Sequence, residues 1–332
     1  MNIPIYPLRF KPIYKERPWG GNKLREILGK EAPPHLRIGE SWEISDRGAD
    51  ATVVAEGHYA GLTLHGLMEA MGNRLLGDRV ISRHPKRFPL LYKILDVEAL
   101  LSLQVHPPDD YPNLQPGEEG KSEFWYVLAA SPGASVICGL KEGADKRTFK
   151  RLLQEHRVEK LLTEYAIAPG DGIFIPAGRL HTASPSCLIA EIQTNSDTTY
   201  RVWDWGRVGA DGKPRQLHLE QALEVIDWKD RAPPRVEPDR EQTGENEIAL
   251  LLISEQFTVE RIRVKARYED VCDGRRFEVL TGVEGEGEIT AERAGSVSIR
   301  IRKGDFILLP AYLGDYTIRT DKGITVLKSY VT

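Results

Sequence analysis

Short apolar runs separated by turn-forming residues are the feature that most constrains how this chain can fold. The runs are four to eight residues long and lie between Gly, Pro, Asp and Asn, which is typical of β-strands. Apolar residues at helical spacing occur in only three segments, 62–76, 145–162 and 217–226, the second of which Asp145 can cap. Many short strands with few helices predict a mainly β fold with small helical inserts. The predicted strands are 41–44, 51–55, 90–95, 102–105, 124–128, 135–138, 172–175, 188–193, 249–253, 257–264, 277–281, 297–301, 305–309 and 323–329.

A repeated motif predicts that the fold contains two related barrels. A Gly-Asp turn, a short apolar strand and a proline occur at 168–181 (APGDGIFIPAGRLH) and again at 302–314 (RKGDFILLPAYLG). Such a unit is a reusable hairpin, although two ordinary hairpins can also be alike by chance. The second copy has Asp315 or Tyr316 near the place where the first has His181. We therefore expect a metal ligand in the first barrel only.

The segment 229–246 separates these two halves. It is rich in proline and charge and almost free of apolar residues, which is typical of a linker. The expected organisation is therefore an N-terminal metal-binding domain at 1–228, a linker at 229–246 and a C-terminal barrel without the metal at 247–332.

Charge and cysteine content narrow the classes of partner and the compartment. The formal net charge is −4, so there is no positive field to hold nucleic acid or an anionic membrane. No run of 18 apolar residues indicates a membrane span, and the N-terminus lacks the apolar core of a signal peptide. The three cysteines form no CxxC pair, which favours reduced, buried thiols and a cytoplasmic protein.

The segment 101–128 carries the pattern of a metal site. Gln104 and His106 are two residues apart on a predicted strand and so share a face, and Glu123 begins another apolar run on a neighbouring strand. His181, at the start of the strand after the one ending at Ile175, completes four donors. The set carries one negative charge and suits zinc, and also Mn²⁺, Co²⁺ or Fe²⁺. His106, Glu123 and His181 alone also match the iron site of an oxygenase, and a single histidine such as His106 is often only structural.

Four further polar residues are candidates for catalysis. Lys93 lies inside an apolar run, where a lysine is costly unless it is paired, extends to the rim or serves a site. Lys121 lies two residues before Glu123. Asp197 and Arg201 could form an ion pair, or act as a proton relay beside a guanidinium that binds anions.

An aromatic cluster accompanies these residues. Tyr200, Trp203 and Trp205 lie close in sequence to Arg201 and Arg207. Sugars stack on aromatic rings and phosphates bind arginine, so a sugar phosphate is one expected occupant. Packing in the core explains the same rings equally well.

Several motifs together resemble the type I mannose-6-phosphate isomerases, in the short bacterial form of the cupin superfamily. The resemblance covers nearly the whole chain and rests on the order of the motifs GESWEIS, FPLLYKILD, LSLQVHP, GKSEFW, IPAGRLH and NSDTTYRVWDWGR. It implies a fold of two cupin-type jelly-roll β-barrels. It also implies an aldose–ketose isomerase that interconverts mannose 6-phosphate and fructose 6-phosphate through a cis-enediol. As partners it implies a small sugar phosphate and either a monomer or a weak homo-oligomer.

The resemblance also assigns roles to individual residues. It implies one Zn²⁺ per chain held by Gln104, His106, Glu123 and His181, and catalytic roles for Lys93, Lys121, Asp197 and Arg201. One position departs from the pattern, because Gly120 stands where the longer relatives carry a histidine. Two other functions stay open at this point, namely a sugar-phosphate-binding cupin without catalysis and a metal-dependent cupin oxygenase.

Overall fold

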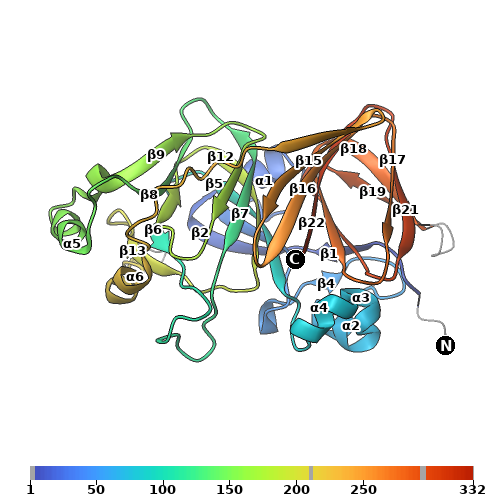
Figure 1. Cartoon of the computed structure of the whole chain (residues 1–332), viewed down its shortest axis with the longest axis horizontal. Coiled ribbons are helices and arrows are strands. Elements are labelled where there is room, and N and C mark those ends of the chain that lie inside the picture. Colours follow the sequence, from blue (N-terminus) through green and yellow to red (C-terminus); the bar gives the residue numbers. More distant parts are fainter. Residues whose placement is uncertain (1–3, 209–211, 292–296, 332) are drawn as a thin grey trace. The chain divides into compact units, whose positions relative to one another are not determined.

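The computed structural model describes residues 4–208, 212–291 and 297–331, and its contacts divide the chain into two compact units (Figure 1). Each unit is assembled from separate stretches of sequence. Unit 1 comprises Met1–Ile13, Trp42–Tyr92 and Glu237–Thr332, and unit 2 comprises Tyr14–Ser41 and Lys93–Val236. The boundaries expected from composition, at 228 and 247, remain a prediction.

Unit 1 is built on one antiparallel sheet of 11 strands (Figure 1). Its main path runs β14-β15-β16-β22-β18-β20-β1-β4, and β17, β19 and β21 pair alongside it. The strands are β1 (Leu8–Lys11), β4 (Val53–Val54), β14 (Asp239–Thr243), β15 (Asn246–Ile253), β16 (Phe257–Val264), β17 (Arg267–Cys272), β18 (Glu278–Ala291), β19 (Val297–Arg302), β20 (Phe306–Leu309), β21 (Gly314–Arg319) and β22 (Ile324–Val331). The helical insert holds the turn η1 (Gly48–Asp50), α2 (Leu64–Met71), α3 (Asn73–Leu76) and α4 (Asp78–Arg83).

The sheet of unit 1 encloses an apolar core because alternate residues of its strands share one face. Ile262 and Val264 of β16 pack with Ile324 and Val326 of β22 in this core. Tyr316, one of the two residues near the place where the first copy of the repeated motif has His181, is also a buried core residue.

Unit 2 consists of two sheets (Figure 1). The six-stranded sheet has the order β10-β7-β12-β5-β3-β2 and the five-stranded sheet the order β13-β6-β11-β8-β9. The first contains β2 (Ile13–Gly21), β3 (Ile38–Ile44), β5 (Leu90–Val97), β7 (Glu123–Ala130), β10 (Gly172–Ile175) and β12 (Cys187–Thr194). The end residues 13, 42–44 and 90–92 of β2, β3 and β5 fall within the bounds of unit 1. The second contains β6 (Leu103–Val105), β8 (Ser135–Leu140), β9 (Leu162–Ala166), β11 (His181–Ala183) and β13 (Tyr200–Trp203). The helices are α1 (Lys23–Glu26), α5 (Lys146–Gln154), η2 (Val158–Leu161) and α6 (Leu219–Val225).

Apolar residues cover both faces of the five-stranded sheet. Cys138 and Ala183 on its inner face pack with Trp125 and Ile189 of the other sheet. On its outer face, residues such as Val105 pack in a second core together with α5 and α6. Since neighbouring residues on a strand point to opposite faces, any polar residue that alternates with the outer-core residues points inward, between the sheets.

The mainly β architecture with small helical inserts is confirmed, whereas helix continuity is not. The predicted helix at 62–76 is broken at Gly72, whose φ is 54°, and so forms α2 and α3. The predicted helix at 145–162 ends as α5 at Gln154 and gives way to η2. Asp145 does cap α5, because its carboxylate accepts a hydrogen bond from the Thr148 N–H at 2.8 Å.

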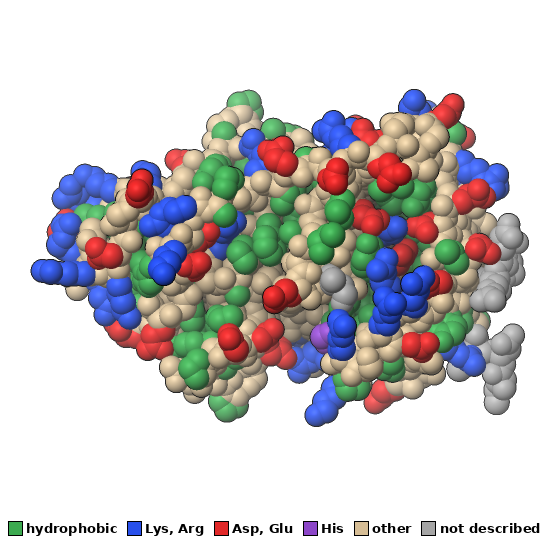
Figure 2. All heavy atoms as spheres, in the orientation of Figure 1, with side chains coloured by type: hydrophobic (Ala, Val, Ile, Leu, Met, Phe, Trp, Pro, Cys, Tyr) green, Lys and Arg blue, Asp and Glu red, His purple; other side chains and the backbone are tan. Residues whose placement is uncertain are grey.

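The distribution of surface charges and the burial of the cysteines agree with what the sequence predicts. Figure 2 shows Lys and Arg side chains interspersed with Asp and Glu over the face that it draws, as a net charge of −4 would suggest. Within the described residues, no helix combines the length and apolar character needed to cross a membrane. Cys138, Cys187 and Cys272 are buried free thiols.

Candidate active site and metal centre

Three strands of the five-stranded sheet place Arg201, Gln104 and His181 in one row. Arg201 of β13 pairs directly with Gln104 of β6, which pairs directly with His181 of β11. Residues opposite each other in paired strands share a face. The neighbours Leu103 and Val105 pack in the outer core, so Gln104 points to the inner face. The row therefore faces the other sheet.

The six-stranded sheet contributes the residues that oppose this row. Glu123 opens β7, and the next inward residue, Trp125, pairs directly with Glu191 of β12. Lys93 comes from β5, the neighbour of β12. The carboxylate of Glu123 thus reaches the histidines from the facing sheet and not from a neighbouring strand of the same sheet.

His106, Glu123 and His181 form a buried cluster that could hold a metal ion. Their ligand atoms all lie within 4.8 Å of one another. His106 Nε2 lies 3.1 Å from Glu123 Oε1, and His181 Nε2 lies 3.6 Å from Glu123 Oε2. All three side chains are at most 1% exposed. Two imidazoles and a carboxylate are donors that suit zinc and other divalent transition metals.

The hydrogen bonds of the two rings leave acceptor atoms facing one another in the cluster. His106 Nδ1 donates to the Thr198 carbonyl and His181 Nδ1 to the Arg179 carbonyl, both at 2.9 Å, since a carbonyl can only accept. Each neutral ring therefore presents a bare Nε2 to the other ligands. His106 Nε2 and both oxygens of Glu123 are buried without a hydrogen bond of good geometry. A cation placed among these acceptors would satisfy them.

The protonation states also suit metal binding. Burial and the neighbouring positive charges lower the pKa of His106, and they lower the pKa of His181 to about 3. Burial alone would raise the pKa of Glu123, but Lys121 and His106 hold it well below its usual range. Neutral imidazoles and an ionised carboxylate are the forms that bind metals.

Gln104 lies beside the cluster. Its amide nitrogen is 3.2 Å from His181 Nε2, and its amide oxygen accepts a hydrogen bond from Ser102 at 3.1 Å. Rotating the amide by half a turn would exchange the two atoms and present the oxygen to a metal. Its predicted role as a fourth ligand stays a prediction.

Lys121 is buried and its ammonium lies 2.7 Å from Glu123 Oε1. Burial lowers the pKa of Lys121, but the carboxylates of Glu123, Glu191 and Asp197 outweigh it and raise the pKa above its usual value. Lys121 therefore stays charged and keeps Glu123 ionised.

Gly120, next to Lys121, is a position that excludes any side chain. A Cβ added there would lie 2.4 Å from the backbone nitrogen of Asp109, and the Gly120 N–H already donates to the Asp109 carboxylate at 3.0 Å. The histidine of the longer relatives has no room here.

Lys93 is paired with a carboxylate that the sequence motifs do not point to. Its ammonium lies 3.3 Å from Glu191 Oε2, and the Trp125 indole donates to Glu191 Oε1 at 2.9 Å. Burial and the charge of Glu123 raise the pKa of Glu191 to about 7. The available signal was a carboxylate inside the apolar run 188–193, the same kind of signal that singles out Lys93.

Arg201 and Asp197 lie at the more accessible side of the cluster. Asp197 is exposed, whereas Arg201 is half-buried and donates to the Gln216 carbonyl at 2.9 Å. The two residues form no ion pair with each other. Burial and the neighbouring Arg215 lower the pKa of Arg201, whose Nε has no hydrogen-bond partner among the described residues. A basic group with a free donor is suited to bind an anion.

The three rings of the predicted aromatic wall pack against the outer core and not against the side chain of Arg201. Tyr200 points to the outer core, and Trp203 and Trp205 line a separate surface pocket. Arg207 pairs with Asp204.

Comparisons with known proteins give one family. Residues 8–132 match the family model of the phosphomannose isomerase type I catalytic domain. A probable mannose-6-phosphate isomerase of Bacillus subtilis, GmuF, is 34% identical over 94% of this chain and 96% of its own length. The B. subtilis mannose-6-phosphate isomerase ManA is 35% identical over 94% and 95%. A crystal structure of mannose 6-phosphate isomerase from B. subtilis superposes with a TM-score of 0.86 at 32% identity, covering 97% of this chain and 99% of that one.

Proposed function

Because the chain belongs to the type I phosphomannose isomerases, we propose that it interconverts mannose 6-phosphate and fructose 6-phosphate through a cis-enediol. Its relatives at about one-third identity cover nearly the full length, so the whole chain and not one domain carries the likeness. The reaction moves one proton between C2 and C1 of the open-chain sugar. The site must therefore polarise a substrate oxygen, provide a proton carrier and hold the phosphorylated end.

The metal that we propose is one Zn²⁺, held by His106, Glu123 and His181, with Gln104 as the fourth ligand. Three buried acceptor atoms that lack good hydrogen bonds support this assignment. When bound, zinc supplies Lewis acidity that polarises a substrate oxygen. Three or four protein ligands leave a coordination position for that oxygen.

Lys93 and Glu191 are the proposed proton carriers, with Asp197 as a further acid–base candidate. A carboxyl with a pKa of about 7 can take up or release a proton at neutral pH, which is the range in which general acid–base catalysis is most effective. The Lys93 ammonium lies 3.3 Å from Glu191 Oε2, so the two groups can act together on one substrate. Trp125 fixes the carboxyl through its indole N–H.

Lys121 and Arg201 are the proposed charge stabilisers. Lys121 holds Glu123 in its ionised form, and Arg201 lies directly opposite Gln104. From that place its guanidinium would stabilise the enediolate or the substrate phosphate.

The buried group of facing acceptors is the observation that carries this proposal, and an assay of apo and reconstituted protein tests it. We expect fructose 6-phosphate to form from mannose 6-phosphate in a coupled assay, to stop when a chelator removes the metal, and to resume when Zn²⁺ is added. His181→Ala should lose both metal and activity. His65→Ala is the matched control, because His65 pairs with Asp46 in unit 1. Isomerase activity that persists after confirmed loss of metal would refute the metal-dependent mechanism.

Sugar-phosphate binding without turnover by metal-loaded protein would instead indicate a non-catalytic cupin. Cytoplasmic residence and a monomeric or weakly oligomeric state remain predictions.

A further inference from the structure

A surface pocket of unit 2 is lined by none of the residues proposed for catalysis, and half of its lining residues carry flat rings. Its volume is about 300 Å³. It lies between the end of α5 with η2 and the strand β13 with its following turn; Figure 1 labels α5 and β13. The lining residues are Leu153, His156, Val158, Glu159, Trp203 and Trp205.

Strained backbone is concentrated around this pocket. Among the described residues, three that are not glycine have a positive φ, namely His156, Ser186 and Trp205, and two of the three line the pocket. A positive φ is costly for a residue with a side chain and tends to be retained where that side chain has a function.

His156 occupies a position that glycine would fill at lower cost. It follows the C-cap of α5 with a φ of 56°, the conformation in which helices commonly end at glycine. Its ring lies 4.9 Å from the Trp203 ring at an angle of 48°. The side chain at this position therefore adds a wall to the pocket that glycine would not provide.

Trp205 is held in an equally unusual turn. Trp205 and Gly206 have φ values of 59° and 69°, and the Arg207 N–H donates to the Asp204 carbonyl at 3.0 Å. Turns with two such residues favour asparagine, aspartate or glycine, and a bulky aromatic residue is an outlier there. The indole N–H donates to the Leu101 carbonyl at 2.5 Å. The ring is therefore fixed before any ligand arrives.

The chemistry of the lining defines the class of ligand. None of the six residues is a lysine or arginine, so the pocket offers no counter-charge to a phosphate. It offers two half-buried indoles, an imidazole and the exposed carboxylate of Glu159, which can accept hydrogen bonds from hydroxyl groups. Aromatic faces bind the C–H faces of sugar rings, and a volume of 300 Å³ is at the small end of ligand pockets.

We propose that the pocket of Trp203, Trp205 and His156 is a binding site for a neutral hexopyranose ring, separate from the sugar-phosphate site. The rigid indoles would stack on the ring, and Glu159 would accept its hydroxyl protons. Fixed aromatic walls lower the ordering cost of binding, which suits a small ligand of modest affinity.

The test uses methyl α-D-mannopyranoside, which has no phosphate and a blocked anomeric carbon. Saturation-transfer NMR with the full chain should show binding with a millimolar Kd in the presence of saturating fructose 6-phosphate, which occupies the catalytic site. A signal that fructose 6-phosphate abolishes would place the probe in the catalytic site and overturn the proposal, as would the absence of any signal at 100 mM probe.

Variants separate binding from folding. His156→Gly should weaken binding of the probe about threefold or more while Tm stays unchanged or rises, because glycine suits the positive φ better. Trp203→Ala should abolish the signal, and Trp203→Phe should retain part of it because a flat ring remains. Leu217→Ala, at an exposed apolar residue outside the pocket, is the matched control and should bind as the parent does. Parent-like binding by both His156→Gly and the folded Trp203 variants would overturn the proposal.

Discussion

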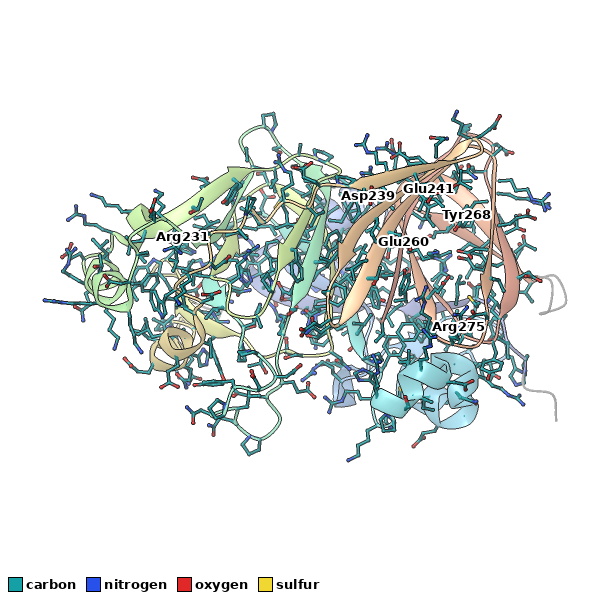
Figure 3. The ribbon with its side chains drawn as sticks, in the orientation of Figure 1. Arg231, Asp239, Glu241, Glu260, Tyr268 and Arg275 are labelled. Carbon is teal, nitrogen blue, oxygen red and sulfur yellow. The ribbon has the colours of Figure 1, made fainter. Side chains whose placement is uncertain are left out.

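Both units of the chain bury a group of ionisable side chains, and the two groups differ in how well their atoms are satisfied. In unit 2, His106 Nε2 and both oxygens of Glu123 have no good hydrogen bond. In unit 1, the Lys328 ammonium lies 2.8 Å from Asp270 and 2.9 Å from Glu260, and the Tyr316 hydroxyl donates to Glu278 at 3.0 Å. Figure 3 labels Glu260 on β16 and Tyr268 on β17, whose hydroxyl donates to Asp270 at 2.8 Å.

This difference separates a site prepared for a ligand from an internal polar network. A buried polar group without a hydrogen bond is costly, so three such acceptors facing one another indicate a place that another species completes. The network in unit 1 is completed by its own groups, because the Lys328 ammonium pairs with both Asp270 and Glu260. We therefore expect changes in unit 2 to affect metal and turnover, and changes in unit 1 to affect stability.

Glu123→Gln gives the largest expected effect. It preserves volume but removes the negative charge from the proposed metal ligands, and we expect kcat/KM to fall roughly 10³-fold, since electrostatic stabilisation of this kind contributes several kcal/mol. Metal analysis of the purified variant should show reduced occupancy. Glu260→Gln in unit 1 is the control and should keep near-normal turnover. Near-normal turnover and metal content in Glu123→Gln would remove the contrast between the units.

Lys328→Met tests whether the polar network of unit 1 contributes to stability and not to turnover. Removing one partner of a buried ionic network leaves the carboxylates of Asp270 and Glu260 uncompensated, which typically costs about 3–5 kcal/mol. Chemical denaturation should show this loss, while kcat/KM per folded molecule stays unchanged. Lys265→Met, at an exposed lysine of the same unit, should change stability by less than about 0.5 kcal/mol. An equal loss of stability in Lys328→Met and Lys265→Met would contradict the assigned network.

The pH dependence of stability sharpens the comparison further. Burial and the nearby Asp270 raise the pKa of Glu278 from 4.5 to about 7. The native state then binds this proton more tightly than the unfolded state, so the contribution of Glu278 to stability is fully present below pH 4.5 and is lost as pH rises through about 7. The full effect is at most about 3 kcal/mol.

In Glu278→Gln, Tm measured from pH 5 to 8 should therefore fall less than in the parent. Part of the slope should remain, because burial also raises the pKa of Glu191 to about 7. A slope identical to that of the parent would show that Glu278 ionises normally.

The smallest expected effects come from the helix N-caps, which both units have. Thr63 caps α2 in unit 1 by accepting from the Gly66 N–H at 3.1 Å, and Asp145 caps α5 in unit 2. Replacing either residue with alanine should lower stability by about 1 kcal/mol and leave kcat/KM unchanged. A loss of turnover in Asp145→Ala alone would show that α5 is coupled to the catalytic residues.

The sequence predicts a strand where its own apolar residues form a recognisable pattern, and misses a strand that lacks one. Strand β16 has the predicted bounds 257–264, because apolar and polar residues alternate at both of its ends, and Ile262 and Val264 lie in the core. Strand β14, by contrast, is wholly exposed, and its polar residues Asp239 and Glu241 (Figure 3) give no apolar signal. Only its pairing with β15 makes it a strand, and pairing partners cannot be read from local sequence.

The same limit applies to the candidate site. Gln104 and His106 are found by spacing within one strand, and His181 by the context of its turn. The partnership of Lys93 with Glu191 depends on β5 and β12 being neighbours, although almost 100 residues separate them in the sequence. The metal cluster likewise needs two sheets to face each other, which spacing along the chain does not specify.

The interleaved course of the chain has a consequence for its synthesis. Leu8 of β1 pairs with Leu308 of β20, so this part of the first strand of unit 1 meets its partner only after nearly the whole chain has been made, whereas Phe10 can pair early with Val54 of β4. At about 5–20 residues per second, that wait lasts roughly 15–60 s on the ribosome. Unit 2 is completely translated at Val236, well before β20. The segment that carries the proposed metal ligands can therefore fold first, while the β20-pairing residues of β1, Leu8 and Arg9, remain without that partner and chaperones would have to protect them.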